Sequence, residues 1–62
     1  MQSTEELRRA LVVAEGRELR QALIDANGSA QKAAELLGIT RQTVWRRMRR
    51  HGIEIQRVVT AA

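Results

Sequence analysis

The sequence predicts an all-α protein, and three observations support this class. Proline is absent, Trp45 is the only aromatic residue, and apolar residues recur at intervals of three and four between residues that favour helix ends. A β-sandwich or β-barrel usually draws on more aromatic residues for its strands. We therefore expect four short helices in a single domain over residues 1–62.

The first predicted helix begins at Ser3 or Thr4 and runs to about Ala14. Either hydroxyl can cap the helix, and Glu5 and Glu6 then face the positive end of the helix dipole. Its apolar stripe consists of Leu7, Ala10, Leu11 and Ala14.

The second predicted helix covers about residues 16–26 and ends at Asn27 and Gly28, which both tolerate a left-handed backbone. Its apolar stripe consists of Leu19, Ala22, Leu23 and Ala26. Further apolar residues fall outside these two stripes, namely Val12, Val13 and Ile24. A chain of 62 residues without cysteine has a marginal core, so oligomerisation is an expected remedy. We expect residues 1–27 to form a homodimer interface through Leu7, Leu11, Val12, Leu19 and Leu23.

Residues 29–52 form two more predicted helices joined by a tight turn. Ser29 caps the third helix, which stops at Gly38, and Thr40 caps the fourth, which stops at Gly52. The buried face of the fourth helix is expected to consist of Val44, Met48 and the ring of His51. Small side chains in the third helix would let a neighbour approach closely, at Ala30, Ala33 and Ala34. The tail, residues 53–62, shows no capped pattern and is assigned only a packing role for Ile53 and Ile55.

The net charge of +4 is unevenly distributed along the chain. Residues 1–31 hold four arginines and five acids, a net charge of −1, whereas residues 32–62 hold seven basic residues and two acids, a net charge of +5. Five of the arginines fall within residues 41–50, with no acid among them. Such an asymmetry indicates a polyanionic partner for the second half of the chain.

Two short helices joined by a glycine turn, the second of them basic, have the layout of a helix-turn-helix. On the fourth helix, the residues opposite the Val44 and Met48 stripe are Gln42, Arg46 and Arg49, flanked by Thr43 and Arg50. This face could enter the major groove of duplex DNA. In that docking mode the N-terminal tip, with Thr40 and Arg41, points towards base edges, and Arg47 lies near the rim within reach of a phosphate.

The stretch "NGSAQKAAELLGITRQTVWRRMRRHGI" resembles the C-terminal DNA-binding module of the Fis type. Such modules occur in the nucleoid protein Fis and at the end of NtrC-like bacterial enhancer-binding activators. The resemblance covers residues 19–53 and rests on the N-G turn, the alanine pair before a double leucine, G-I-T-R, T-x-x-R-R and H-G-I. Val44 and Trp45 depart from the usual leucine and tyrosine.

The resemblance implies that Thr40 and Arg41 approach bases, that Thr43, Arg46 and Arg47 hold the DNA backbone, and that the first two helices form the dimer interface. Ser29 and Arg50 complete the predicted set of DNA contacts, and Gln42 either reads an adenine or is simply an exposed polar residue. The predicted function is sequence-specific binding of duplex DNA by a homodimer in transcription regulation. We expect a bacterial, cytoplasmic protein of the nucleoid. We also expect a module cut from a larger activator, because the first predicted helix is shorter than a free-standing nucleoid protein of this family would need and "MQST" is typical of a domain start.

Several alternatives remain open at the level of sequence. The chain could be a free-standing nucleoid-associated protein, a dimerisation module with an incidental basic helix, an RNA binder or a membrane-surface helix. An enzyme is not expected, because one histidine, one aspartate and no cysteine leave no candidate triad, metal cluster or phosphate loop. Neither a cofactor nor a metal site is expected. Trp45 is interpreted as a partly buried packing residue, although stacking on a nucleic acid is the other interpretation.

Overall fold

The computed structural model describes residues 3–61, with side chains described up to residue 58. The four helices are α1, Thr4–Asp25; α2, Ala30–Leu37; α3, Arg41–His51; and α4, Ile55–Ala61. Met1, Gln2 and Ala62 of the predicted domain lie outside the described residues. The all-α class is confirmed, and the part of the chain that is described contains no strand.

Helix α1 is one continuous helix of 22 residues, whereas the sequence predicts two helices separated near Gly16. The predicted break is wrong because Gly16 serves a different purpose: it is buried, and a Cβ there would stand 3.2 Å from Nδ1 of His51. A glycine inside a helix costs about 1 kcal/mol relative to alanine. The close approach of α3 to α1 at this point explains why the helix carries a glycine here.

The predicted starts of the other elements are confirmed by their caps. Oγ of Ser3, Oγ of Ser29 and Oγ1 of Thr40 each accept a hydrogen bond from the backbone N–H three residues further on, at 3.1 Å. Each of these bonds satisfies one of the amide groups that a helix start leaves without a partner. The sequence therefore determines where α1, α2 and α3 begin.

The ends of α2 and α3 are built alike. Gly38 and Gly52 both adopt a left-handed backbone, with φ of 69° and 63°. In each case the residue after the glycine donates its N–H back into the last turn, from Ile39 to the oxygen of Ala34 at 3.0 Å and from Ile53 to the oxygen of Met48 at 2.9 Å. This arrangement is a Schellman motif, which turns the chain sharply and points the following apolar residue towards the core.

The core lies where the C-terminal half of α1, α2 and α3 meet. Its buried residues are Leu19, Ala22, Leu23, Ala26, Ala30, Ala33, Ala34, Val44, Met48 and Ile53. The predicted close approach at the alanines of α2 is confirmed, since all three are buried. Leu19 and Leu23 are only 1% and 0% exposed, so they belong to the protomer's own core and not to a surface that a second copy could reach. The predicted interface therefore requires correction at these two positions.

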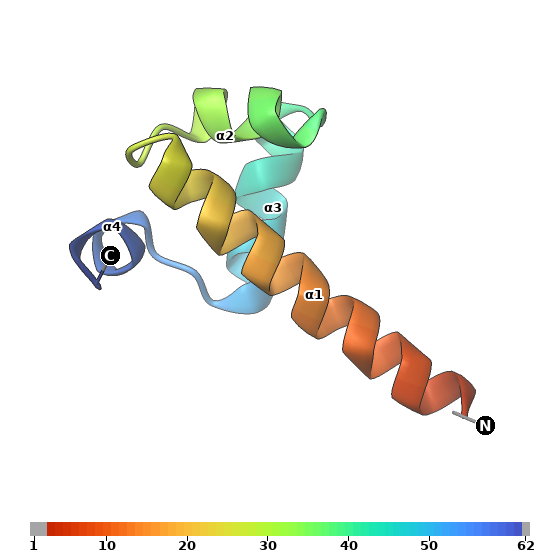
Figure 1. Ribbon diagram of the computed structural model, residues 1–62. Coiled ribbons are helices and arrows are strands. Elements are labelled where there is room, and N and C mark those ends of the chain that lie inside the picture. The colour runs from red at the N-terminus through yellow and green to blue at the C-terminus, as the bar shows by residue number, and fades with distance from the viewer. Residues whose placement is uncertain (1–2, 62) are drawn as a thin grey trace.

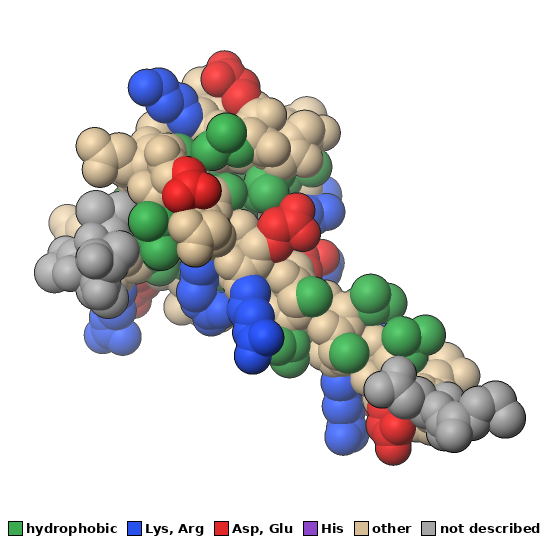
Figure 2. Space-filling view, in the orientation of Figure 1, with side chains coloured by type: hydrophobic (Ala, Val, Ile, Leu, Met, Phe, Trp, Pro, Cys, Tyr) green, Lys and Arg blue, Asp and Glu red, His purple; other side chains and the backbone are tan. Residues whose placement is uncertain are grey.

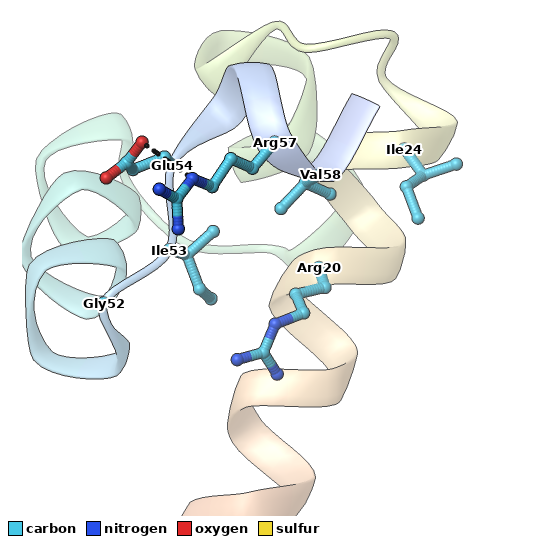
Figure 3. Close-up of a pocket in the computed structure, with 7 residues that line it drawn as sticks. All are labelled: Arg20, Ile24, Gly52, Ile53, Glu54, Arg57 and Val58. Carbon is cyan, nitrogen blue, oxygen red and sulfur yellow. Dashed lines mark ion pairs between the residues drawn. The ribbon is translucent and has the colours of Figure 1, made fainter. Parts of the chain in front are cut away.

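The tail forms helix α4, for which the sequence shows no capped pattern. Ile53 is buried, and Ile55 and Val58 pack against the core, so the predicted packing role of the isoleucines is confirmed. A hollow of about 390 Å³ lies where α4 meets α1. Figure 3 shows the side chains that line it, among them the apolar Ile24, Ile53 and Val58. The guanidinium of Arg57 pairs with Glu54 at 3.5 Å beside this hollow.

The N-terminal half of α1 projects away from the other three helices as an arm (Figure 1). A 22-residue helix is roughly 33 Å long, which accounts for the overall extents of 39 × 24 × 17 Å. Figure 2 shows hydrophobic side chains exposed along this arm. The large ones are Leu7, Leu11, Val12 and Val13.

Candidate nucleic-acid interface

The turn between α2 and α3 fixes the direction in which α3 leaves the core. Gly38 reverses the chain, Ile39 packs against the core, and Thr40 caps the next helix. Val44 and Met48 hold α3 from below, at 0% and 5% exposure. The side of α3 that carries Arg41, Gln42 and Arg46 is therefore presented to solvent.

Three side chains at the N-terminal end of α3 form a connected polar network. The hydroxyls of Thr40 and Thr43 lie 2.8 Å apart, and Oγ1 of Thr43 accepts a hydrogen bond from a terminal nitrogen of Arg46 at 3.4 Å. The hydroxyl of Thr40 is thus engaged in capping and in this network. These contacts orient Arg46 along the tip of the helix, where a backbone phosphate could meet it.

Most of the predicted DNA contacts lie on this one exposed helix. Arg41, Gln42 and Arg46 are exposed, and Thr43 is half-buried beside them. Ser29, the predicted contact outside α3, caps the N-terminal end of α2.

The indole of Trp45 also faces solvent, at 47% exposure. It lies outside the buried core cluster, and its partial exposure agrees with the predicted partly buried residue at the edge of the apolar stripe. The helical spacing of four places it next to Arg41 and Arg49 on the surface of α3. An exposed tryptophan among arginines adds an apolar, flat surface to the basic face.

Glu15 of α1 holds the opposite flank of α3, and no pattern in the sequence indicates this contact. Its Oε1 lies 2.8 Å from Nε2 of His51, 3.5 Å from a terminal nitrogen of Arg50 and 3.9 Å from Nε of Arg47. The arginine cluster therefore does have a compensating acid, which lies 32 positions before Arg47 and 35 before Arg50 in the chain. The spacing of residues within one helix does not predict a contact between side chains that lie so far apart in the sequence.

The cluster lowers the pKa of Glu15 below its ordinary value of 4.5. The hydrogen bond with His51 is the largest cause, and the positive charges of Arg47 and Arg50 act in the same direction. Desolvation of the carboxylate opposes them without reversing the sign.

We expect this cluster to contribute to the acid sensitivity of folding. The folded pKa of Glu15 lies below the unfolded one, so its contribution to stability is fully present above about pH 4.5 and is lost as the pH falls through the folded pKa. Glu15→Gln keeps the size of the side chain and its hydrogen-bonding capacity but not its charge. The difference in Tm between the wild-type protein and this variant should therefore shrink below pH 4.5, as measured by circular dichroism.

Glu18→Gln is the matched control, because Glu18 lies one turn further along α1 and forms no ion pair with the described side chains. If both variants show the same pH dependence of Tm, the Glu15 cluster does not contribute to stability.

The described residues offer little for other kinds of site. No group of three or more His, Cys, Asp or Glu side chains within them could hold a metal ion. Among the helices described, none has the length and apolar character needed to cross a membrane.

Comparison with known proteins gives one match. A family model described as "Bacterial regulatory protein, Fis family" matches residues 7–51, which is most of the chain and includes the whole of α2 and α3. No curated protein and no solved structure matches the chain significantly. The match spans the turn, the arginine-bearing helix and part of the arm.

Proposed function

The chain belongs to the Fis family of bacterial regulatory proteins, a helix-turn-helix family whose members bind DNA, and from this membership we propose that it binds specific duplex sequences as a homodimer. The observation that carries the proposal is the basic helix α3. One face of this helix is packed into the core through Val44 and Met48, and the opposite face is exposed to solvent. The proposed function consists of DNA binding and requires no catalysis by this chain.

The exposed arm of α1 supports the dimeric state. At 100° per residue, Leu7 and Leu11 point roughly 80–120° away from the core stripe that contains Leu19. Their stripe is therefore not directed at the protomer's own core, and Leu11 is 64% exposed. We propose that Leu7, Leu11 and Val12 pair with the same residues of a second copy around a two-fold axis, because closed two-fold dimers are the commonest assembly of such chains.

A two-fold dimer would recognise two-fold related half-sites. In helix-turn-helix dimers the recognition helices enter successive major grooves about 34–36 Å apart. Each α3 would enter with its N-terminal tip first, so that Arg41 and Gln42 approach base edges. Arg46, oriented by Thr43, would meet a phosphate beside them.

We also propose that the chain regulates transcription as the DNA-binding module of a larger bacterial activator, acting in the cytoplasm at the nucleoid. The support is the resemblance of residues 19–53 to the terminal modules of such activators. The mass of the native gene product in bacterial cells, determined with an antibody against this chain, tests that context.

A salt titration of DNA binding tests the proposed function. Trp45 is the only tryptophan and lies exposed on α3, so its emission should change when duplex DNA binds. The logarithm of the binding constant should fall linearly with the logarithm of salt concentration, because arginine–phosphate contacts release counterions. Duplex RNA and anionic vesicles should bind more weakly at equal salt. Equal binding of duplex RNA or vesicles would contradict the proposal.

Arg46→Ala should identify the phosphate contact. We expect binding to all duplex sequences to weaken by a similar factor, with the magnitude of the salt slope reduced by about 0.9 for each phosphate interaction that the substitution removes from a protomer. Arg57→Ala is the control, since it removes the same charge from α4, where Arg57 is exposed and paired with Glu54. An unchanged slope for Arg46→Ala would place this side chain in solvent, away from the DNA.

A further inference from the structure

We propose that Glu15 limits the affinity of the protein for DNA by holding Arg47 and Arg50 against α1, so that DNA phosphates must compete with this carboxylate for two of the five arginines of α3. Glu15 is in this sense a positioning residue that acts through the arginines. The inference rests on the proposed DNA-binding function and deepens it.

The geometry of the cluster supports a specific role and not a chance surface pair. Glu15 belongs to α1, and its side chain is 27% exposed. Its Oε1 lies 2.8 Å from Nε2 of His51, whose side chain is 9% exposed. Gly16, the next residue, lets the His51 ring approach the α1 backbone. The carboxylate is thereby fixed at the junction of the two helices, with both guanidinium groups on the same oxygen.

The arginines of α3 divide into two groups around this carboxylate. Arg47 is 33% exposed at the side chain and Arg50 is 60% exposed, so both still reach solvent from the flank. For the other three, Arg41, Arg46 and Arg49, no ion pair with an acid is formed within the described side chains. One flank of α3 is therefore partly neutralised, and the rest of its exposed face keeps its charge.

Glu15 opposes DNA binding through the two arginines that it holds. When Arg47 or Arg50 turns to a phosphate, it leaves Glu15 with one partner fewer, close to an approaching polyanion. The gain from the new phosphate interaction is offset by the broken ion pair and by repulsion between carboxylate and phosphate. The protein thus binds DNA with fewer effective cations than its sequence carries, which lowers non-specific affinity most.

Glu15→Gln tests the proposal, because glutamine keeps the hydrogen bond to His51 while removing the charge. We expect binding to non-specific duplex DNA at low salt to become about two- to fivefold tighter per protomer, the range given by exposed ion pairs. The salt slope should become steeper, by up to about 0.9 for each arginine released. Glu18→Gln, with the same loss of charge from α1 but no ion pair with α3, should change affinity less and leave the slope unchanged.

A second measurement uses the arginines themselves and does not depend on the folding of the Glu15 variant. In the wild-type background, Arg47→Ala should weaken binding less than Arg46→Ala, because Arg47 is already paired. In the Glu15→Gln background, the loss of affinity caused by Arg47→Ala should grow. This coupling between positions 15 and 47 indicates competition. If Glu15 had only a structural role, the Glu15→Gln substitution would lower affinity in every background.

The outcomes separate the proposal from the function beneath it. If the wild-type protein binds no duplex DNA, the proposed function fails and this inference fails with it. If the wild-type protein binds but Glu15→Gln binds with unchanged or lower affinity and an unchanged slope, the inference alone is wrong. It is also wrong if Arg47→Ala and Arg46→Ala weaken wild-type binding equally.

Discussion

Leu11→Asp is expected to convert the proposed dimer into folded monomers that bind a palindromic site far more weakly. Leu11 is 64% exposed in the protomer, so an aspartate there leaves the core intact. In a two-fold interface, however, the substitution places two carboxylates where two leucines would be buried. Burying a leucine side chain contributes about 1.5–3 kcal/mol, and both copies lose it.

The effect on DNA binding should be larger still. Two linked recognition helices gain about 10²–10⁴ in affinity over one, because the second engagement is intramolecular. Sedimentation at micromolar concentration gives the oligomeric state, circular dichroism gives the helix content, and titration of full and half-sites gives the loss of avidity. The affinity of the variant for a half-site should stay close to the affinity of the wild-type protein for the same half-site.

Val13→Asp is the matched control for this substitution. It introduces the same charge on the same arm, but two residues further along, which is roughly 160° around the helix from Leu11. Val13 is also exposed in the protomer. This variant should remain dimeric. A Leu11→Asp protein that stays dimeric would place the interface on another surface.

How much of the fold the sequence predicts depends on the range of the interactions involved. The caps at Ser29 and Thr40 and the glycine at position 38 act within a few residues, and all three are where the sequence predicts them. The break near Gly16 is wrong because a close approach of His51, 35 residues away, explains that glycine. Local pattern does not distinguish a glycine that ends a helix from one that admits a neighbour.

The apolar periodicity of α1 shows a similar limit. It identifies Leu11 and Leu19 equally as members of an apolar stripe, but it does not state which partner each stripe meets. The structure assigns Leu19 to the protomer's own core and leaves Leu11 exposed. In a continuous helix α1, the stripe with Leu11 and the stripe with Leu19 point in different directions around the helix axis. The sequence does not show that α1 is continuous, and the structure does.

The candidate interface divides in the same way. The basic face of α3 follows from spacing within one helix, so Arg41, Gln42 and Arg46 are exposed as expected. Glu15 could not be found from sequence, because its role depends on α1 crossing α3 at Gly16. Trp45 lies beside the stripe that Val44 and Met48 fill, so it is only partly covered, as a residue at the edge of an apolar stripe is expected to be.

Arg41→Ala is expected to remove most of the sequence preference at one base pair of each half-site. Arg41 is the first residue of α3, exposed, and directly follows the cap at Thr40. In the helix-turn-helix docking mode the first residues of this helix reach deepest into the major groove. A guanidinium there can donate two parallel hydrogen bonds to O6 and N7 of guanine, an interaction worth about 1–3 kcal/mol of discrimination.

The structure strengthens the assignment to Arg41 over its neighbours. The hydroxyl of Thr40 is used in capping, and Arg46 is drawn towards Thr43. Arg47 and Arg50 are paired with Glu15 on the flank. Arg41 combines a position at the tip with no ion pair to an acid among the described side chains, so it is the arginine best placed to read a base.

The measurement is a base-by-base binding scan of a palindromic site at fixed salt. Arg41→Ala should flatten the preference at two positions related by the two-fold axis, and Arg41→Lys should restore it only in part, because a point charge lacks the planar fork of the guanidinium. Arg49→Ala, which removes an exposed arginine from the other end of α3, should lower affinity while leaving the preferences in place. If Arg41→Ala lowers affinity evenly and every base preference survives, Arg41 contacts a phosphate, and the specificity arises from the deformability of the DNA.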